Sequence, residues 1–503
     1  MEAITILNAL EINEFAFENL NNNISSVEQA IKRGKSFPEV GEVAIISDKK
    51  KNFIFPDGVK VLSIDKFSSK DFFKAMAELG ENYKTVFFAS CDAPFLDANI
   101  TEELFQTHKK YKAEYTFADG YPKGLAPEVL DMGLVKILAS ISNLENIKGN
   151  REFVFDVLKQ NINSYDIEVI IADEDTSDLR LEFFSNSKRN FLLCQNFLNI
   201  NTKNYYELIK TNSKKFFTLP AFYAIEISAE RSVNKIYHPE KKISDTEKIL
   251  SLDNFKKIID KIVAYSDDAF VSFSIFGEPF LNAEIYNMLE YCFEQKKISV
   301  LIETSALDFD EQQILKIKKL VDEKNAHAKI FWIVTLDAFT GKKYSELSGL
   351  SLELGEKFFN KALENTFLLH QNFSRNVFPQ FIRMNENEDE LEEFYRFWNE
   401  KINKVLIQKY DNLAGQIADR RVVDLSPVNR NVCWHLKRDM YILQNGNVLV
   451  CKADAFEKNI VGNIFTDEIK NIREKIFETY LQHLEKNYKG LCDNCDEYYT
   501  YNF

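Results

Sequence analysis

Glycine and proline are scarce in this chain of 503 residues, with 16 and 10 copies, below their usual shares of about 7% and 5%. Such scarcity predicts long regular helices and strands with few flexible linkers. Seven cysteines are too few for a disulfide scaffold and indicate a reducing compartment. No apolar run approaches the roughly 18 residues of a membrane helix. The N-terminal residues include acids but no basic segment, so we expect neither a secretory signal nor a membrane partner.

Basic residues are also in deficit. The chain has 63 Lys and Arg against 77 Asp and Glu, a net charge of −14, which argues against a nucleic-acid partner. Hydrophobic residues at 45% and charged residues at 28% are typical of globular protein and exclude intrinsic disorder. The sequence therefore predicts a folded cytoplasmic protein of several domains.

Three blocks are distinguishable along the chain. Residues 1–205 alternate short apolar runs with helical patterns, which predicts an α/β domain with a doubly wound, mostly parallel sheet. Residues 215–415 repeat the alternation and predict a partial β/α barrel. Residues 425–503 contain Asn445-Gly446 between two short strands, a strong hairpin signal. The predicted strands of the first two blocks are Ala3–Ala9, Val43–Ser47, Val59–Ile64, Thr85–Ser90, Ile167–Ala172, Phe222–Ser228, Ala269–Ile275, Ser299–Glu303, Lys329–Leu336 and Val377–Arg383.

Four of the seven cysteines lie in the last block, in the order C-x17-C-x40-C-x2-C. They are Cys433, Cys451, Cys492 and Cys495. A C-x2-C pair lets two thiolates reach one metal centre, and folding the hairpin over the helix that follows it brings the other two cysteines near the pair. Four thiolates suit a 4Fe–4S cluster or a zinc ion. The alternative is four unrelated buried thiols.

Finer spacing favours iron and sulfur. Cys433 and Gly446 are separated by 12 residues, Gly446 and Cys451 by four, and Gly462-Asn463-Ile464 precedes the predicted helix. This pattern resembles the SPASM domain, which carries auxiliary clusters in many radical SAM enzymes. Full SPASM domains have further cysteines after the C-x2-C pair, and this chain has none, so the resemblance implies one 4Fe–4S cluster and not two.

The middle block resembles a radical SAM domain that lacks its cluster motif. After strand Phe222–Ser228, the three cysteine positions hold Arg231, Lys235 and His238. Arg and Lys are protonated at neutral pH and cannot replace thiolates. The resemblance therefore implies a protein that does not cleave S-adenosylmethionine at this place. An unrelated strand and loop is the alternative interpretation.

Other segments support the barrel resemblance. The segment Gly277-Glu278-Pro279 resembles the one that contacts the methionine amine in that family, and Thr304 and Asp337 lie at the ends of later strands. Ligands of β/α barrels bind at such strand ends. We therefore predict that these five residues bind a small ligand or cofactor.

The whole chain resembles spiro-SPASM proteins, which combine a transferase-like domain, a radical SAM-like domain and a SPASM domain. In the first block, Thr85–Ser90 is followed by Cys91-Asp92-Ala93-Pro94, similar to a turn of nucleotidyltransferases and GT-A glycosyltransferases. In that fold the Asp holds Mg²⁺ on nucleotide phosphates, so Asp92 is a predicted metal ligand; a turn-capping Asp is the alternative. Tyr115–Leu125 is expected to form a second loop nearby.

The loop after the first strand argues against triphosphate binding. It contains Glu11 and Glu14, no glycine before Gly34 and no cation before Lys32. Without backbone N–H groups or basic side chains, a triphosphate is repelled. A nucleotide-sugar carries less negative charge, which one Mg²⁺ can neutralise, so its binding is compatible with this loop.

Three functions follow from these observations. The leading hypothesis is a radical SAM/SPASM-class iron–sulfur protein with a degenerate initiating site, whose reaction and catalytic residues the sequence does not define. The second is a sugar or nucleotidyl transferase with a regulatory iron–sulfur module. The third is a non-enzymatic scaffold. A peptide or a nucleotide-sugar is the expected ligand.

Overall fold

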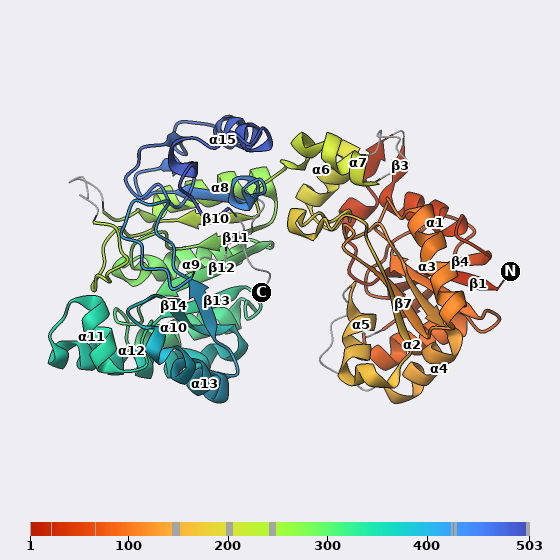
Figure 1. Ribbon diagram of the computed structural model, residues 1–503, viewed down its shortest axis with the longest axis horizontal. Helices are drawn as coiled ribbons and strands as arrows, with labels where there is room; N and C mark the ends of the chain where they lie inside the picture. Colours follow the sequence, from red (N-terminus) through yellow and green to blue (C-terminus); the bar gives the residue numbers. More distant parts are fainter. Residues whose placement is uncertain are drawn as a thin grey trace. The chain divides into compact units, whose positions relative to one another are not determined.

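The computed structural model describes residues 2–21, 23–65, 67–142, 151–197, 205–240, 248–423, 426 and 430–498. The chain forms two compact units, Met1–Thr218 and Leu219–Phe503 (Figure 1). Each unit is built on one large sheet, of seven strands in the first and nine in the second. No helix in the described ranges combines the length and the apolar character needed to cross a membrane.

The seven-stranded sheet of the first unit has the order β5-β4-β1-β6-β8-β7-β9. All pairs are parallel except those made by β8, which is antiparallel to β6 and β7. The strands are β1 (Ala3–Ala9), β4 (Val40–Asp48), β5 (Lys60–Ile64), β6 (Thr85–Ser90), β7 (Tyr115–Asp119), β8 (Glu128–Asp131) and β9 (Ile167–Ile171), and a small hairpin adds β2 (Asn19–Asn21) and β3 (Ile24–Ser25).

Alternation along the strands gives the first unit two hydrophobic cores. In β1, Leu7 packs on one face of the sheet and Ile6 on the other, as the two-residue repeat of a strand requires. Helices α1, α3 and α6 contribute to the first core and α2, α4 and α5 to the second. The helices are α1 (Ser26–Lys35), α2 (Ser69–Leu79), α3 (Ala98–Tyr111), α4 (Met132–Ile141), α5 (Phe153–Leu158), α6 (Lys188–Phe197) and α7 (Tyr205–Thr211).

The sheet of the second unit has the order β15-β14-β13-β12-β11-β10-β16-β17-β18. From β15 to β16 every pair is parallel, and β17 and β18 continue antiparallel. Its strands are β10 (Phe222–Ile225), β11 (Ala269–Ser272), β12 (Ile298–Thr304), β13 (Ile330–Thr335), β14 (Val377–Arg383), β15 (Leu406–Lys409), β16 (Asp439–Ile442), β17 (Asn447–Leu449) and β18 (Ile460–Asn463). The predicted barrel strands and the predicted hairpin thus share one sheet.

Helices connect the parallel strands of the second unit. The sequence of α10 explains why a helix forms there. Asp310 and Gln313 form a capping box at its start, and its apolar side chains recur on one buried face. The helices are α8 (Leu252–Ser266), α9 (Ile285–Glu294), α10 (Glu311–Glu323), α11 (Gly341–Ser348), α12 (Leu352–Phe373), α13 (Leu391–Ile402), α14 (Trp434–Arg438) and α15 (Ile469–Leu484). Strand–helix alternation in both units confirms the predicted α/β class with a doubly wound sheet and a partial β/α barrel.

Some short strands differ from the expectation, and β2, β3 and β8 were not predicted. Residues 115–119 were expected to lie in a loop, and this prediction is wrong, because they form β7 between β8 and β9. Strand β15 was not predicted at all. Its four residues are all half-buried, so its sequence lacks the fully buried positions found in strands such as β13 and β14.

Candidate functional site

A cavity of about 220 Å³ lies at the carboxyl ends of the parallel strands of the second unit. Its wall includes Arg231 after β10, Phe276 and Glu278 after β11, Glu303 near the end of β12 and Asp411 after β15. Of the five residues predicted to bind a cofactor in the barrel, Gly277, Glu278 and Thr304 line this cavity. Pro279 begins a short 3-10 helix, and Asp337 lies beyond the cavity wall.

Gly277 holds the loop after β11 against the loop after β10. A Cβ atom at this position would lie 1.8 Å from the carbonyl oxygen of Ser228, so any other residue would force the two backbones apart. The next residue, Glu278, donates its backbone N–H to the carbonyl of Glu230. The glycine is therefore required by close packing at the cavity wall.

The Glu278 carboxylate is buried and accepts four hydrogen bonds. Thr304 Oγ1 donates at 2.8 Å, the backbone N–H and the hydroxyl of Ser305 at 2.9 and 2.8 Å, and the Phe280 N–H at 3.3 Å. Burial raises its pKa to about 7 even though these donors favour the charged form. Glu278 and Thr304 therefore join the ends of β11 and β12 to each other.

Asp337 is fully buried and also has structural partners. Its Oδ2 accepts from Lys235 Nζ at 3.1 Å and from Tyr237 Oη at 2.6 Å, and its Oδ1 accepts from the Ile382 N–H at 2.8 Å. Its backbone has a φ of +62°, which Asp tolerates better than most residues. These contacts fix the loop after β10 to the ends of β13 and β14.

Arg231, Lys235 and His238, which the sequence resemblance aligns with cluster cysteines, each make contacts within the fold. Arg231 Nε donates to the Phe276 carbonyl at 2.5 Å. Lys235 Nζ also donates to the Leu336 carbonyl at 2.9 Å and lies 4.3 Å from the centre of the Tyr344 ring. His238 Nδ1 accepts the Lys235 N–H, and burial holds its pKa well below the ordinary 6.5.

Glu303 is a cavity residue that sequence reasoning missed. It sits next to Thr304 in β12 and so faces the opposite side of the strand. Burial raises its pKa, an effect that the nearby Lys452 only partly offsets. The only sequence signal was its place near a strand's carboxyl end, which does not reveal burial.

The fold of the second unit brings Cys433 into electrostatic range of the other three C-terminal cysteines. All four thiols are free, and electrostatic interactions link Cys433 to the other three. Burial raises the pKa of each of them. Cys433 is the N-cap of α14 and its sulfur accepts backbone N–H groups from that helix, while Cys451 and Cys495 accept from backbone N–H groups two residues on, at 3.5 and 3.3 Å.

This donor set fits a thiolate-bound metal centre. Buried thiols with raised pKa values become thiolates when a metal cation supplies positive charge beside them. The N–H groups aimed at sulfur then stabilise the charged form.

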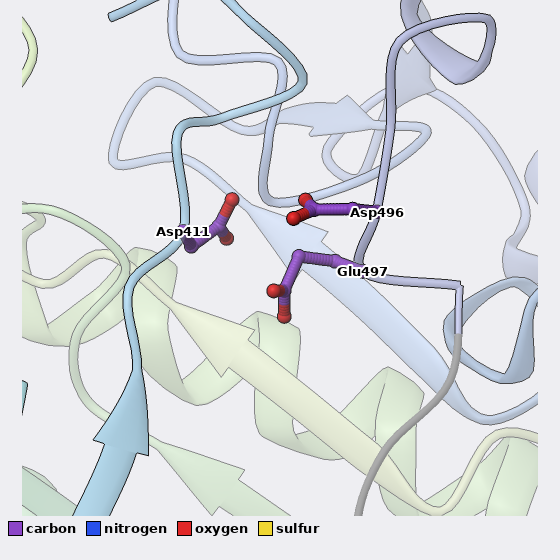
Figure 2. Close-up of side chains that lie close together, drawn as sticks. All are labelled: Asp411, Asp496 and Glu497. Atoms are coloured by element: carbon purple, nitrogen blue, oxygen red, sulfur yellow. The ribbon is translucent and has the colours of Figure 1, made fainter. Parts of the chain in front are cut away.

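A group of three acids lies close to the cysteines. Asp411, Asp496 and Glu497 have oxygens within 4.8 Å of one another (Figure 2). Each has a cationic partner: Lys452 is 3.1 Å from Asp411, and Lys409 contacts both Asp496 and Glu497. The cations already neutralise these carboxylates, so the acids form an ion-pair network and not a vacant metal site.

In the first unit, Asp92 lies just beyond β6 as predicted. Its side chain is fully buried, with Ser90 Oγ donating to Oδ1 at 2.6 Å and Arg151 to Oδ2 at 2.5 Å. The loop after β1 also receives a cation that local sequence did not reveal. Lys51 Nζ donates to the carbonyls of Leu10 and Ile12 at 2.7 and 3.0 Å.

Comparisons with known proteins agree with the cysteine site. Residues 433–496 match the model of the SPASM family, an iron–sulfur cluster-binding domain. An uncharacterized protein of Treponema pallidum (strain Nichols) is 38% identical over 354 residues, which is 70% of this chain and 99% of that protein.

Two solved structures are similar at low sequence identity. Native anSMEcpe with bound AdoMet has a TM-score of 0.40 and 13% identity, covering 54% of this chain and 85% of its own. A cytidylyltransferase from Leptospira borgpetersenii serovar Hardjo-bovis has a TM-score of 0.35 and 16% identity, covering 43% of this chain and 96% of its own.

Proposed function

From the premise that this chain belongs to the same family as the uncharacterized Treponema pallidum protein and has a SPASM domain, we propose that it is an iron–sulfur protein of the radical SAM/SPASM class. One four-iron cluster is held by Cys433, Cys451, Cys492 and Cys495. The observation that supports this assignment is that Cys433, which is buried, interacts electrostatically with the three half-buried cysteines, and that the sulfurs of Cys433, Cys451 and Cys495 accept backbone N–H groups. The cluster contributes folding free energy and a redox centre next to the barrel.

The loop after β10 holds no second cluster in this proposal. Lys235 and Asp337 form an ion pair with side chains 3% and 0% exposed, at a position where a cluster would need a thiolate. Burying a lysine is costly unless a carboxylate pairs with it, so the two residues depend on each other. The protein therefore does not cleave S-adenosylmethionine reductively through this loop.

The cavity instead binds a small anionic ligand. Arg231 carries a permanent charge on the wall, whereas burial raises the pKa of both Glu278 and Glu303 and so reduces their negative charge. This balance favours a carboxylate or phosphate near Arg231 and disfavours a sulfonium cation such as that of S-adenosylmethionine. The carboxylate end of a peptide is one ligand with this chemistry.

Metal analysis of the anaerobically purified chain tests the cluster. We expect about four irons and four sulfides per chain, with the broad visible absorption of a thiolate-bound cluster. Stoichiometric zinc, or about eight irons per chain, would contradict the proposal.

A turnover experiment tests the degenerate loop. The reduced protein is incubated with S-adenosylmethionine, and 5′-deoxyadenosine is measured against a Cys492→Ala variant. We expect none from either protein. Formation of 5′-deoxyadenosine that survives the loss of Cys492 would show that the middle of the chain initiates radical chemistry.

A transferase is the second candidate function, on a specific observation in the first unit. Asp92 lies where β1 and β6 adjoin and the chain crosses from one half of the sheet to the other. Ligands of doubly wound sheets bind at such switch points. A nucleotide-sugar is the proposed donor. The test is to measure its binding to the full chain, which Asp92→Asn should weaken.

A further inference from the structure

The Asp92 carboxylate at the β1–β6 switch point already has a cation beside it. Both of its oxygens accept hydrogen bonds, Oδ1 from Ser90 and Oδ2 from Arg151, and the side chain has no exposed surface. The backbone carbonyl of Asp92 accepts the N–H of Ser185 at 3.0 Å, which attaches the neighbouring segment to this turn. Two hydrogen bonds thus hold the carboxylate of Asp92 and a third holds its backbone.

Arg151 is held firmly but retains donor capacity. Its guanidinium carbon lies 4.5 Å from the centre of the Phe184 ring, and its side chain is 19% exposed. A guanidinium has five N–H donors, and its Nη2 serves Asp92. Nε is buried and has no hydrogen-bond partner within the described ranges.

A divalent ion on Asp92 would have to share the carboxylate with this guanidinium. Arg is charged at every accessible pH, so it cannot yield the site by losing a proton. The buried location weakens screening by solvent, and the repulsion between the two cations is correspondingly strong. A metal ion and the Arg151–Asp92 pair therefore exclude each other.

We infer that Arg151 takes the place of the divalent metal, so that the first unit binds an oxyanion without one. Asp92 is a positioning residue that aims the guanidinium, and the anion is a phosphate group, whose geometry matches the planar Arg fork. This inference deepens the transferase candidate by giving its diphosphate-bearing donor a metal-free contact, and it is independent of the iron–sulfur proposal.

Calorimetric titration with inorganic diphosphate in EDTA tests the inference. The iron-loaded full chain carries Arg231→Gln throughout, which removes the cation from the wall of the second unit's cavity. We expect binding that millimolar Mg²⁺ does not strengthen. Arg151→Gln should weaken it by about 10- to 100-fold, and Arg151→Lys, which keeps the charge but not the fork, by about 10-fold. Arg33→Gln, on helix α1, is the matched control and should leave affinity unchanged. Thermal unfolding of each variant confirms that it is folded.

Two results would overturn the inference in distinguishable ways. Mg²⁺-dependent diphosphate binding that is lost in Asp92→Asn would show that the metal site is real, and the transferase candidate would stand without this inference. If diphosphate does not bind with or without Mg²⁺, both the anion site and the transferase candidate are contradicted. If diphosphate binds equally well to Arg151→Gln, only the anion site at Arg151 is contradicted.

Discussion

Strands β10 and β16 pair in parallel, and the segments at their two ends bury polar groups differently. Before β16, Cys433 and its three partner cysteines form a group of thiols with N–H donors aimed at sulfur. The loop after β10 contains no thiol, and its Lys235 is buried against Asp337. The first arrangement needs an external cation to hold thiolates, whereas the second carries its own cation. In the proposed function, the first region holds a metal centre, whereas the second is stabilised by its own ion pair.

The largest expected effect comes from breaking the thiol group. Cys492→Ala removes one of the four proposed ligands, and the iron content should fall from about four per chain towards zero, because one iron of the cluster loses its thiolate. Ligation and folding are coupled, so the C-terminal residues should also become sensitive to protease. Cys292→Ala, a buried thiol in α9, is the control and should keep its iron. Full iron retention in Cys492→Ala would contradict the assignment.

Breaking the ion pair should have the next largest effect. Lys235→Met leaves Asp337 buried without its cation and should lower the free energy of unfolding by about 3–5 kcal/mol in urea titrations. The exposed pair Lys248–Glu230 provides the control, where Lys248→Met should cost about 0–1 kcal/mol. The double variant Lys235→Met/Asp337→Asn should recover part of the loss. Equal effects of the two single variants would show that the buried pair is not special.

The pH dependence of stability tests the cavity wall. Because burial raises the pKa of Glu278 from 4.5 to about 7, the folded state binds a proton that the unfolded state has released. The stabilisation is complete below pH 4.5 and is lost as the pH rises to about 7, a change of about 3 kcal/mol for the second unit. Glu278→Gln should flatten this slope, and Glu311→Gln, on the exposed start of α10, should not. An unchanged slope in Glu278→Gln would place the titration elsewhere.

The smallest effect is expected at the acidic group of Figure 2. Lys409, Lys452 and Arg421 already pair with Asp411, Asp496 and Glu497, so millimolar Ca²⁺ should shift the melting temperature by less than about 1 °C. Lys409→Gln serves as the comparison, because it removes a cation shared by two of the acids. A saturable increase in the melting temperature of the unmodified chain would identify a calcium site.

Local sequence patterns predicted the structure correctly where a few neighbouring residues determine it. The strands Ala3–Ala9, Thr85–Ser90 and Val377–Arg383 were predicted with the bounds observed, because each is a bounded apolar run. Gly446 has the positive φ that its hairpin turn demands. Edge strand β15 escaped prediction, since half-buried residues leave no clear apolar signal.

The sequence by itself determined the fold class and the presence of a SPASM domain, because the order and spacing of residues encode both. The cluster ligands Cys433, Cys451, Cys492 and Cys495 and the degenerate site after β10 stay predictions. Tertiary structure decided what the remaining polar residues do. Lys235 reaches Asp337 across 102 positions, and Arg151 reaches Asp92 across 59. Pairs so far apart in the chain meet only in the folded protein, and burial then raises the cost of leaving either charge without its partner.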